Sequence, residues 1–194
     1  MLILASTSPR RKEILNFFSL KFKVIPSNFD ETEVKFVKDA KSYVLEIAEK
    51  KALALDERFF NDIIISADTI VYAHNKIYTK PNNAEDAKRI LEELSNSWHE
   101  ILTAVCIKHK NRIYKDVEKT KVLFHDLDEI KIKKYHNAIY FSDKAGGYAI
   151  QKAGSIIIKK MIGCYYNAMG MPINTLNKLL MKAGIDLWDY LKPF

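Results

Sequence analysis

The first eleven residues constrain the fold most, because they place a strand, a turn and the start of a helix in immediate succession. Residues Leu2 to Ala5 are apolar and predict a short buried strand. A hydroxyl-rich turn follows, in which Ser8 suits a helix N-cap and Pro9 suits the first helical position. The chain therefore begins as a strand that passes directly into a helix.

Two arginines, Arg10 and Arg11, lie in the first turn of this expected helix. Their charges are locally unfavourable, because the N-terminal end of the helix dipole is already positive. A bound anion would reverse the penalty, since free N–H groups, hydroxyls and guanidinium groups would all converge on it. The alternative is a basic helix start in contact with water, and this segment alone does not separate the two.

Beyond this segment, strand patterns and helix patterns mix along the chain. Strands are expected at 22–26, 63–65, 148–150 and 156–158, and helices at 9–18, 39–56, 83–94, 128–136 and 172–183. Hairpins are expected at 69–78 and at 102–124, the second around the polar turn 109–112. This order predicts an α/β fold with a mixed sheet and flanking helices, in one domain over residues 1–194.

Size and charge narrow the classes of protein. The 194 residues are 48% hydrophobic with a net charge of +7, which suits a globular domain whose partner is anionic: a nucleotide, a nucleic acid or an acidic membrane surface. No apolar run approaches the roughly 20 residues of a membrane span, and no signal peptide is recognisable, so we expect a cytoplasmic protein with no membrane contact. Cys106 and Cys164 form no CxxC pair, so we expect packed cysteines rather than a zinc site or a disulfide.

Two acidic segments are candidates for chemistry. Asp68 follows the β-branched run 63–65, where open α/β sheets place ligand-binding groups, although a turn-forming aspartate is the alternative. The cluster at 30–33 contains Glu31, which together with Asp68 could supply hard oxygen ligands to Mg²⁺ or Mn²⁺. Taken alone, that cluster would be a solvated loop.

One lysine lies on the wrong face of its helix for a solvated residue. At about 100° per residue, Lys51 falls in the middle of the apolar stripe of helix 39–56, whereas Lys50 points to water. A lysine in such a stripe must be paired, extend along the apolar surface or enter a polar site. We therefore expect Lys51 in the functional site.

Three further polar residues lie at turns. Lys80 precedes a proline at the end of the first hairpin, Gln151 follows a glycine turn, and Asn167 precedes the last helix. The amide of Gln151 carries both a donor and an acceptor and could recognise the edge of a base. The glycine turn is neither a P-loop nor GxGxxG, and no Ser/His/Asp arrangement indicates covalent catalysis.

Taken together, these segments resemble the Maf family of nucleoside triphosphate pyrophosphatases over residues 2 to about 183. The segments that carry the resemblance are LASTSPRR at 4–11, DET at 30–32, EKKA at 49–52, SADTIV at 66–71, TKP at 79–81, KAGGYAIQ at 144–151 and YYNAMGMP at 165–172. Each motif is modest, but seven in this order are specific. The chain departs from the family at Lys152, where glycine is common, and at Ala168, where valine is common.

The resemblance implies a fold like that of inosine triphosphate pyrophosphatases, with two lobes around a cleft. It implies hydrolysis of a nucleoside triphosphate to the monophosphate and pyrophosphate with a divalent metal, Mg²⁺ or Mn²⁺. The acid–base aspartate of the family falls on Asp68, and its other polar site positions fall on Ser8, Arg11, Glu31, Lys51 and Lys80.

The resemblance also implies a base preference. Three positions that divide the family are here Arg10, Thr69 and Gln151, a combination similar to the branch that acts on dTTP and UTP. The branch that acts on 7-methyl-GTP has tryptophan, glutamine and glutamate there. A homodimer is compatible with the resemblance, and removal of non-standard nucleotides and control of cell division both stay open as cellular roles.

Two alternatives from other classes remain. One is a nucleotide-binding regulator of septum formation without catalysis, against which the full set of acid, lysines and arginines argues. The other is a nucleic-acid-binding module, but Lys131, Lys133 and Lys134 form the only dense basic group and no aromatic motif accompanies it. We therefore expect a nucleotide substrate and no nucleic acid partner.

Overall fold

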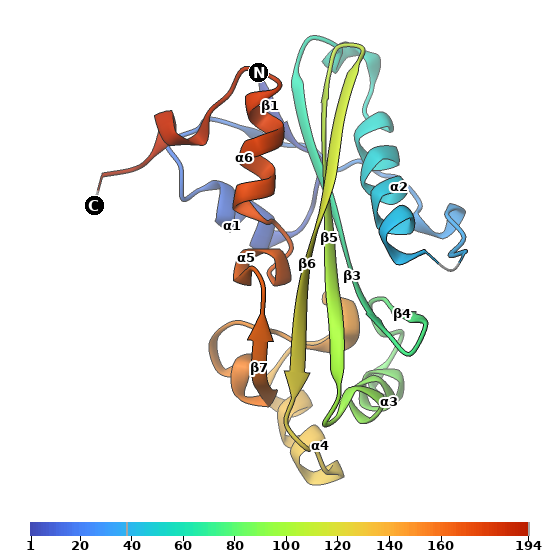
Figure 1. The fold of residues 1–194 in the computed structure, drawn as a ribbon. Coiled ribbons are helices and arrows are strands. Elements are labelled where there is room, and N and C mark those ends of the chain that lie inside the picture. The colour runs from blue at the N-terminus through green and yellow to red at the C-terminus, as the bar shows by residue number, and fades with distance from the viewer. Residues whose placement is uncertain (38, 194) are drawn as a thin grey trace.

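A computed structural model describes residues 1–37 and 39–193, which form one seven-stranded mixed sheet flanked by helices (Figure 1). Along the sheet the strand order is β2–β1–β3–β5–β6–β7, and β4 pairs with β3. The strands are β1 Leu2–Leu4, β2 Lys23–Val24, β3 Ile63–Ala73, β4 Lys76–Tyr78, β5 Trp98–His109, β6 Arg112–Phe124 and β7 Ile158–Ile162. Strand β1 is parallel to β2 and β3, and the other pairs are antiparallel, so the predicted mixed α/β fold is confirmed.

The helices cover both faces and one end of this sheet. They are α1 Pro9–Leu15, α2 Ala40–Leu53, α3 Ala84–Leu94, α4 Glu129–Ala138, α5 Tyr165–Ala168 and α6 Ile173–Met181, with 3₁₀ turns at Glu31–Glu33, Glu57–Phe59, Ala145–Gly147, Lys152–Ile157 and Leu187–Tyr190. In Figure 1, α1 and α6 lie on one side of the upper sheet and α2 on the other, while α3 and α4 lie at the lower end. The long strands β3, β5 and β6 run through both halves. None of the helices in the described ranges is long and apolar enough to cross a membrane.

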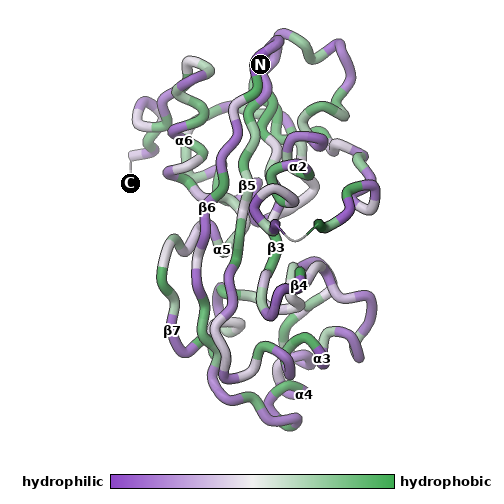
Figure 2. Tube along the Cα trace, turned by 45° about the vertical axis from the view of Figure 1, so that its right-hand side comes forward, coloured by the Kyte–Doolittle hydropathy of each residue, from purple (hydrophilic) through white to green (hydrophobic). Residues whose placement is uncertain are grey.

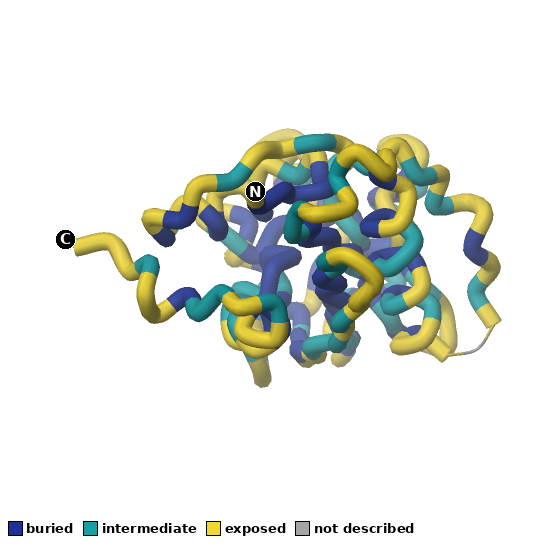
Figure 3. The backbone as a smooth tube through the Cα atoms, turned by 90° about the horizontal axis from the view of Figure 1, so that it is seen from above, coloured by how far each residue is buried: buried dark blue, intermediate teal, exposed yellow. Residues whose placement is uncertain are grey.

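Strand alternation and side-chain caps explain why these elements form. Successive residues of β3 face opposite sides, so Ile65 packs with the core beneath α1 and α6, and Ile64 packs with the core beneath α2. Figure 2 shows hydrophobic stretches along β3 and β5, and Figure 3 shows buried residues gathered at the centre of the molecule. The carboxylates of Asp39 and Asp128 accept backbone N–H groups at the starts of α2 and α4.

One edge of β3 is only partly paired. Strand β1 pairs with Ile63–Ile65 and β4 pairs with Val71–Ala73 on this edge, whereas β5 pairs with residues 63–72 on the opposite edge. Residues 66–70 therefore have no neighbouring strand on the first edge within the described chain. The carbonyl oxygen of Ile65 accepts a hydrogen bond from the N–H of Ala5, which follows β1. Backbone polar groups alternate between the two edges of a strand, so those of residues 67 and 69 point toward this gap.

The structure joins elements that the sequence separated. The expected strand at 63–65 and the first arm of the expected hairpin at 69–78 are one eleven-residue strand, β3. Its hairpin to β4 turns through His74 and Asn75, both with positive φ, which matches the twist of tight hairpins. Cys106 is buried as expected, but Cys164 is only half-buried.

Two predicted strands near the C-terminal half are wrong. Residues 148–150 form no strand, because Gly146 and Gly147 turn the chain with φ of 71° and 70° and the hydroxyl of Tyr135 bonds the N–H of Ala149 at 3.0 Å. The strand expected at 156–158 begins only at its last residue, and a 3₁₀ turn takes the residues before it. A side-chain hydroxyl thus replaces the neighbouring strand that the pattern predicted.

We expect that Tyr135→Phe destabilises the protein by about 1–3 kcal/mol, because it leaves buried backbone groups of residues 149 and 154 without their hydrogen bonds. Denaturant unfolding measures the change. Tyr140→Phe is the control, since Tyr140 is 70% exposed, and it should leave the free energy of unfolding unchanged. Equal stability of both variants would contradict the role given to the Tyr135 hydroxyl.

Candidate functional site

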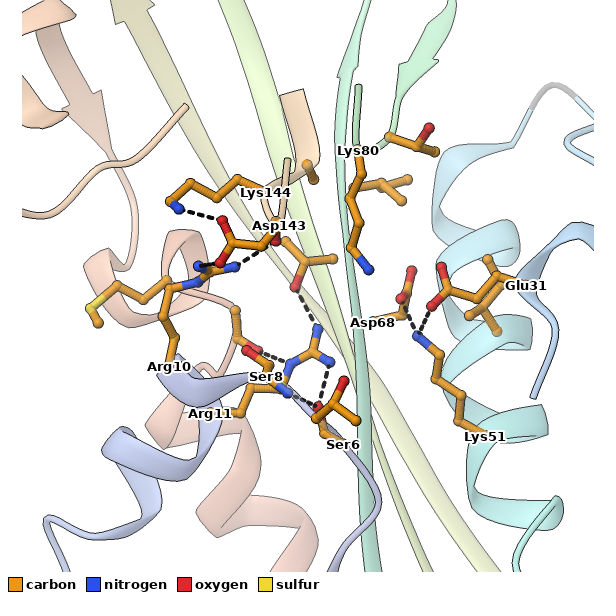
Figure 4. Close-up of a pocket in the computed structure, with 18 of the residues that line it drawn as sticks. Ser6, Ser8, Arg10, Arg11, Glu31, Lys51, Asp68, Lys80, Asp143 and Lys144 are labelled. Atoms are coloured by element: carbon orange, nitrogen blue, oxygen red, sulfur yellow. Dashed lines mark hydrogen bonds and ion pairs between the residues drawn. The ribbon is translucent and has the colours of Figure 1, made fainter. Parts of the chain in front are cut away.

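A pocket of about 390 Å³ opens at the unpaired edge of β3. Its walls come from the turn after β1, the first turn of α1, α2, the end of β4 and the loop before the glycine turn (Figure 4). Among the described residues, five cationic side chains and three acidic ones line it, namely Arg10, Arg11, Lys51, Lys80, Lys144, Glu31, Asp68 and Asp143. The excess of positive charge suits a polyanionic ligand.

A lysine between two carboxylates forms one side of the pocket. The Nζ atom of Lys51 lies 2.6 Å from Oδ1 of Asp68 and 2.7 Å from Oε1 of Glu31. Lys51 and Asp68 are buried, at 8% and 6% exposed. Lys51 therefore lies in the pocket although it comes from the apolar face of its helix, and its partners are two carboxylates that the sequence analysis singled out separately.

The sequence suggested that Asp68 follows the end of a strand, but the structure does not place it there. It lies in the middle of β3, because β5 keeps pairing with that strand far beyond residue 65. The carboxylate is accessible only because β1 ends at Leu4 and leaves the other edge open. Asp68 thus lines the pocket because the neighbouring strand β1 ends early, and not because β3 itself ends there.

Burial and charge act in opposite directions on the two carboxylates. Burial raises the pKa of Asp68, against the attraction of Lys51, so its carboxyl holds a proton more readily than an ordinary aspartate. Burial also acts to raise the pKa of Glu31, but the charges of Lys51, Lys80 and Arg11 together hold it below its usual value. The pair therefore divides into a more basic buried carboxylate and a more acidic one nearer solvent.

The opposite wall is built around Arg11. Its Nε donates to the carbonyl of Gly170 at 2.9 Å, and its terminal nitrogens donate to Oγ of Ser6 at 3.2 Å and Oγ1 of Thr69 at 3.1 Å. Burial lowers the pKa of Arg11, while the charge of Asp68 acts to raise it. Gly170 has φ of 102°, and a Cβ on it would lie 3.3 Å from the Thr69 hydroxyl, so glycine suits this contact.

Arg10 crosses the pocket mouth to a residue that sequence reasoning missed. Its guanidinium donates to Oδ2 of Asp143 at 2.7 Å and to the carbonyl of the same residue at 3.0 Å, and Lys144 also contacts this carboxylate. Arg10 is thus neutralised by a carboxylate 133 positions along the chain, whereas the partners of Arg11 are neutral oxygens. The only sequence signal was that Asp143 directly precedes the glycine motif.

Lys80 and Ser8 also line the pocket, as expected. Lys80 extends from the end of β4 toward Asp68 and Glu31 (Figure 4), and it forms no ion pair with any described residue. Ser8 occupies the N-cap position of α1, but its hydroxyl makes no capping bond there. Both side chains therefore remain available to a ligand.

Gln151 lines the pocket with an unsatisfied polar atom. Its Oε1 is buried and has no hydrogen-bond partner within the described chain. The next residue, Lys152, adopts φ of 54°, the conformation that favours glycine, and its exposed side chain lies outside the pocket. The departure from the family at this position is therefore accommodated by the backbone without obstructing Gln151.

Asn167 is not placed as the sequence predicted. It is fully buried and does not line the pocket, and its amide nitrogen donates to the carbonyl of Ile101 at 3.1 Å and to Oγ1 of Thr120 at 2.9 Å. The prediction that Asn167 binds substrate is therefore corrected to a structural role. The reason is that the short helix α5, which the sequence did not predict, turns its side chain into the sheet.

Tyr148 is a further pocket residue that the sequence analysis did not single out. Its hydroxyl lies 2.6 Å from Nε2 of His99, which is buried on β5. Burial lowers the pKa of His99 to about 3, so the imidazole is neutral at physiological pH. His99 thus fixes an aromatic ring of the pocket.

The donor set suits a divalent ion that shares its coordination with a ligand. In residues 1–37 and 39–193, no group of three or more His, Cys, Asp or Glu side chains is arranged to hold a metal ion by itself. Asp68 and Glu31 each contact Lys51 through one oxygen, which leaves the other oxygen of each carboxylate. Mg²⁺ commonly uses one or two carboxylates together with phosphate oxygens and water, so these residues fit it.

Comparison with known proteins places the chain in a family. The family model described as Maf-like protein matches residues 1–183, and the chain belongs to the Maf family. It is 39% identical over 191 residues to a dTTP/UTP pyrophosphatase of Clostridium botulinum (strain Okra / Type B1), covering 96% of this chain and 98% of that protein. It is likewise 39% identical to a nucleoside triphosphate pyrophosphatase of Chlamydia pneumoniae, covering 97% of each.

Among solved structures, the Staphylococcus aureus Ham1 protein aligns with 98% of this chain and 93% of its own, at 15% identity and a TM-score of 0.43.

We expect Lys51→Met to destabilise the protein by about 3 kcal/mol at neutral pH, because removing one partner of a buried ion pair leaves the Asp68 charge uncompensated. The pKa of Asp68 is already raised, and losing the lysine raises it further. A raised carboxyl pKa stabilises the fold at low pH and loses that effect as pH rises, so the defect should shrink on acidification.

Denaturant unfolding at several pH values measures this, with Lys50→Met as the matched control. Lys50 is the adjacent residue of α2, its side chain is 39% exposed, and it pairs only with Glu46 among the described acidic groups. That variant should change the free energy of unfolding little at any pH. A pH-independent, small effect of Lys51→Met would refute the coupling to Asp68.

Proposed function

We propose that this chain is a metal-dependent nucleoside triphosphate pyrophosphatase that hydrolyses dTTP and UTP to the monophosphate and pyrophosphate. The observation that carries the proposal is the convergence of a buried carboxylate, Asp68, with cationic side chains from both halves of the sheet in one pocket. The names of relatives that match nearly the whole chain support the same activity.

The cationic groups suit a triphosphate. Phosphoryl transfer depends mainly on positioning and on neutralising negative charge, and this pocket offers lysines and arginines on several sides. Lys80 is the group best placed to contact phosphate oxygens, since it has no other ion-pair partner in the described chain.

Asp68 suits the role of the base that positions water. Its raised pKa makes it a better proton acceptor than an ordinary aspartate, and its second oxygen is not engaged by Lys51. A water held there attacks the α-phosphorus and gives its proton to Asp68, and the bond to the pyrophosphate oxygen breaks. A divalent ion held by Asp68 and Glu31 would polarise the phosphate oxygens.

The base preference rests on Gln151. Uracil and thymine present an N3–H donor between two carbonyl acceptors, and the unsatisfied Oε1 of Gln151 requires a donor. A site that loses a hydrogen bond with the wrong base rejects that base. A cationic 7-methylguanine would also approach the positive charge of Arg10.

We expect purified protein to release pyrophosphate from UTP and dTTP with kcat/KM at least about tenfold above that for purine triphosphates and 7-methyl-GTP, because an unmet hydrogen bond costs about that factor. Activity should require Mg²⁺ or Mn²⁺ and stop on chelation. Gln151→Glu should lower kcat/KM for UTP and dTTP, whereas Lys152→Gln, on the exposed neighbouring residue, should not change the preference. Equal use of 7-methyl-GTP and UTP would refute the preference but not the pyrophosphatase activity.

We expect Asp68→Asn to keep the fold and to lower kcat by about 10²–10⁴-fold, the usual cost of losing a general base. Steady-state pyrophosphate release measures the loss, and circular dichroism checks the fold. Asp126→Asn, on an exposed residue outside the pocket, is the control. Near-normal turnover by folded Asp68→Asn protein would remove Asp68 from the mechanism.

A further inference from the structure

A buried hydroxyl lies directly behind the pocket. Thr69 and Thr103 face each other on β3 and β5, with their Oγ1 atoms 3.0 Å apart. Thr69 lines the pocket, whereas Thr103 is fully buried and does not. The Oγ1 of Thr103 also lies 2.8 Å from the backbone carbonyl oxygen of Asn167. The hydroxyl of Thr103 therefore has two oxygen partners and one proton.

The direction of each hydrogen bond in this chain is determined by its ends. The carbonyl of Asn167 can only accept, so the hydroxyl of Thr103 donates to it. Thr103 has no second proton, so in its contact with Thr69 it must accept and Thr69 must donate. The guanidinium of Arg11 can only donate, so Thr69 accepts from it at 3.1 Å. One lone pair of the Thr69 oxygen then remains for the pocket.

We propose that Thr103 is a positioning residue that commits the Thr69 hydroxyl as an acceptor, so that the ligand group bound at Thr69 is an N–H or O–H donor. A deprotonated phosphate oxygen only accepts hydrogen bonds and is excluded from this position. Within the proposed function, on which this inference rests, the triphosphate therefore lies toward the lysine side of the pocket. Thr69 contacts the nucleoside.

The surroundings prevent Thr69 from escaping this arrangement. Arg11 is held at three nitrogens, so its own contact with Thr69 has little freedom. Gly170 packs against the Thr69 hydroxyl, and its positive φ disfavours any larger residue there. The carbonyl that orients Thr103 belongs to α5, whose Asn167 is itself anchored in the sheet. Buried groups thus fix the direction of the hydrogen bonds, and this leaves the Thr69 oxygen as an acceptor for a ligand in the pocket.

A nucleoside offers further donors in its sugar hydroxyls, since the proposed function gives the base N3–H to Gln151. Binding of non-hydrolysable α,β-methylene analogues, measured by calorimetry, identifies the hydroxyl without requiring turnover. The probes are the UTP analogue and its 2′-deoxy and 3′-deoxy forms, with the 3-deaza form, in which C–H replaces N3–H, as a control that reports on Gln151. In the unmodified protein, one of the two deoxy probes should bind about tenfold more weakly, the cost of one hydrogen bond.

In Thr103→Val, that penalty should fall to about threefold or less, because the Thr69 proton loses its acceptor and can turn toward the ligand. Thr103→Ser keeps the hydroxyl and should keep the full penalty. Thr175→Val is the matched control, since it also removes a buried threonine hydroxyl that donates to an acceptor, here Glu118, but touches neither Thr69 nor Asn167. This control should also keep the full penalty. If the penalty instead fell because of a general loss of packing, it would fall in the control as well.

An unchanged penalty in Thr103→Val, or the absence of any penalty in the unmodified protein, would overturn the proposal. If Thr103→Val does not fold, Thr69→Val keeps the proposal falsifiable, because it removes the acceptor itself and a penalty that survives in it would overturn the proposal. Failure of the proposed function would give a different result, in which the analogues bind with the expected pattern but UTP and dTTP release no pyrophosphate.

Discussion

The interrupted pairing along one edge of β3 is the constraint on which the rest of the structure depends. Strands β1 and β4 occupy the two ends of that edge and leave residues 66–70 without a neighbouring strand in the described chain. A buried strand edge without partners is costly, so such a gap must be lined by polar groups and filled by water or ligand. The pocket, and both chemically distinct walls around it, exist because this one strand is paired on only one side there.

The two faces of β3 give the pocket its two kinds of chemistry. Successive residues Asp68 and Thr69 point to opposite sides of the strand, one toward Lys51 on α2 and the other toward Arg11 on α1. An open edge lets a ligand contact both. One wall, formed by Lys51, Asp68 and Glu31, contains charges that are costly to bury and that compensate one another. In the other wall, the only charged group of the Arg11–Thr69 contact is the guanidinium, and its hydrogen-bond partners are uncharged.

Strand β5 links these walls to the core. It pairs with β3 along the whole length of the site, and it supplies Thr103 behind one wall and His99 behind Tyr148. Both residues are buried, and each one forms a hydrogen bond with a side chain that lines the pocket. These buried hydrogen bonds limit how far the pocket residues Thr69 and Tyr148 can turn.

The sequence by itself determined the local elements and the residues whose chemistry is unusual for their position. The strand–turn–helix of residues 2–15, the apolar helix face interrupted by Lys51, and the acid after residues 63–65 all follow from spacing of apolar and polar residues, which is local information. Only the tertiary structure decided which partners meet.

Asp143 lies 133 positions from Arg10, and no local pattern marks that pair. Residues 148–150 had the pattern of a strand but received a tyrosine hydroxyl instead of a neighbouring strand, and Asn167 was turned inward by a short helix. In each case the outcome depends on a contact between distant segments. Such contacts are selected by packing of the whole chain and not by the propensity of any segment.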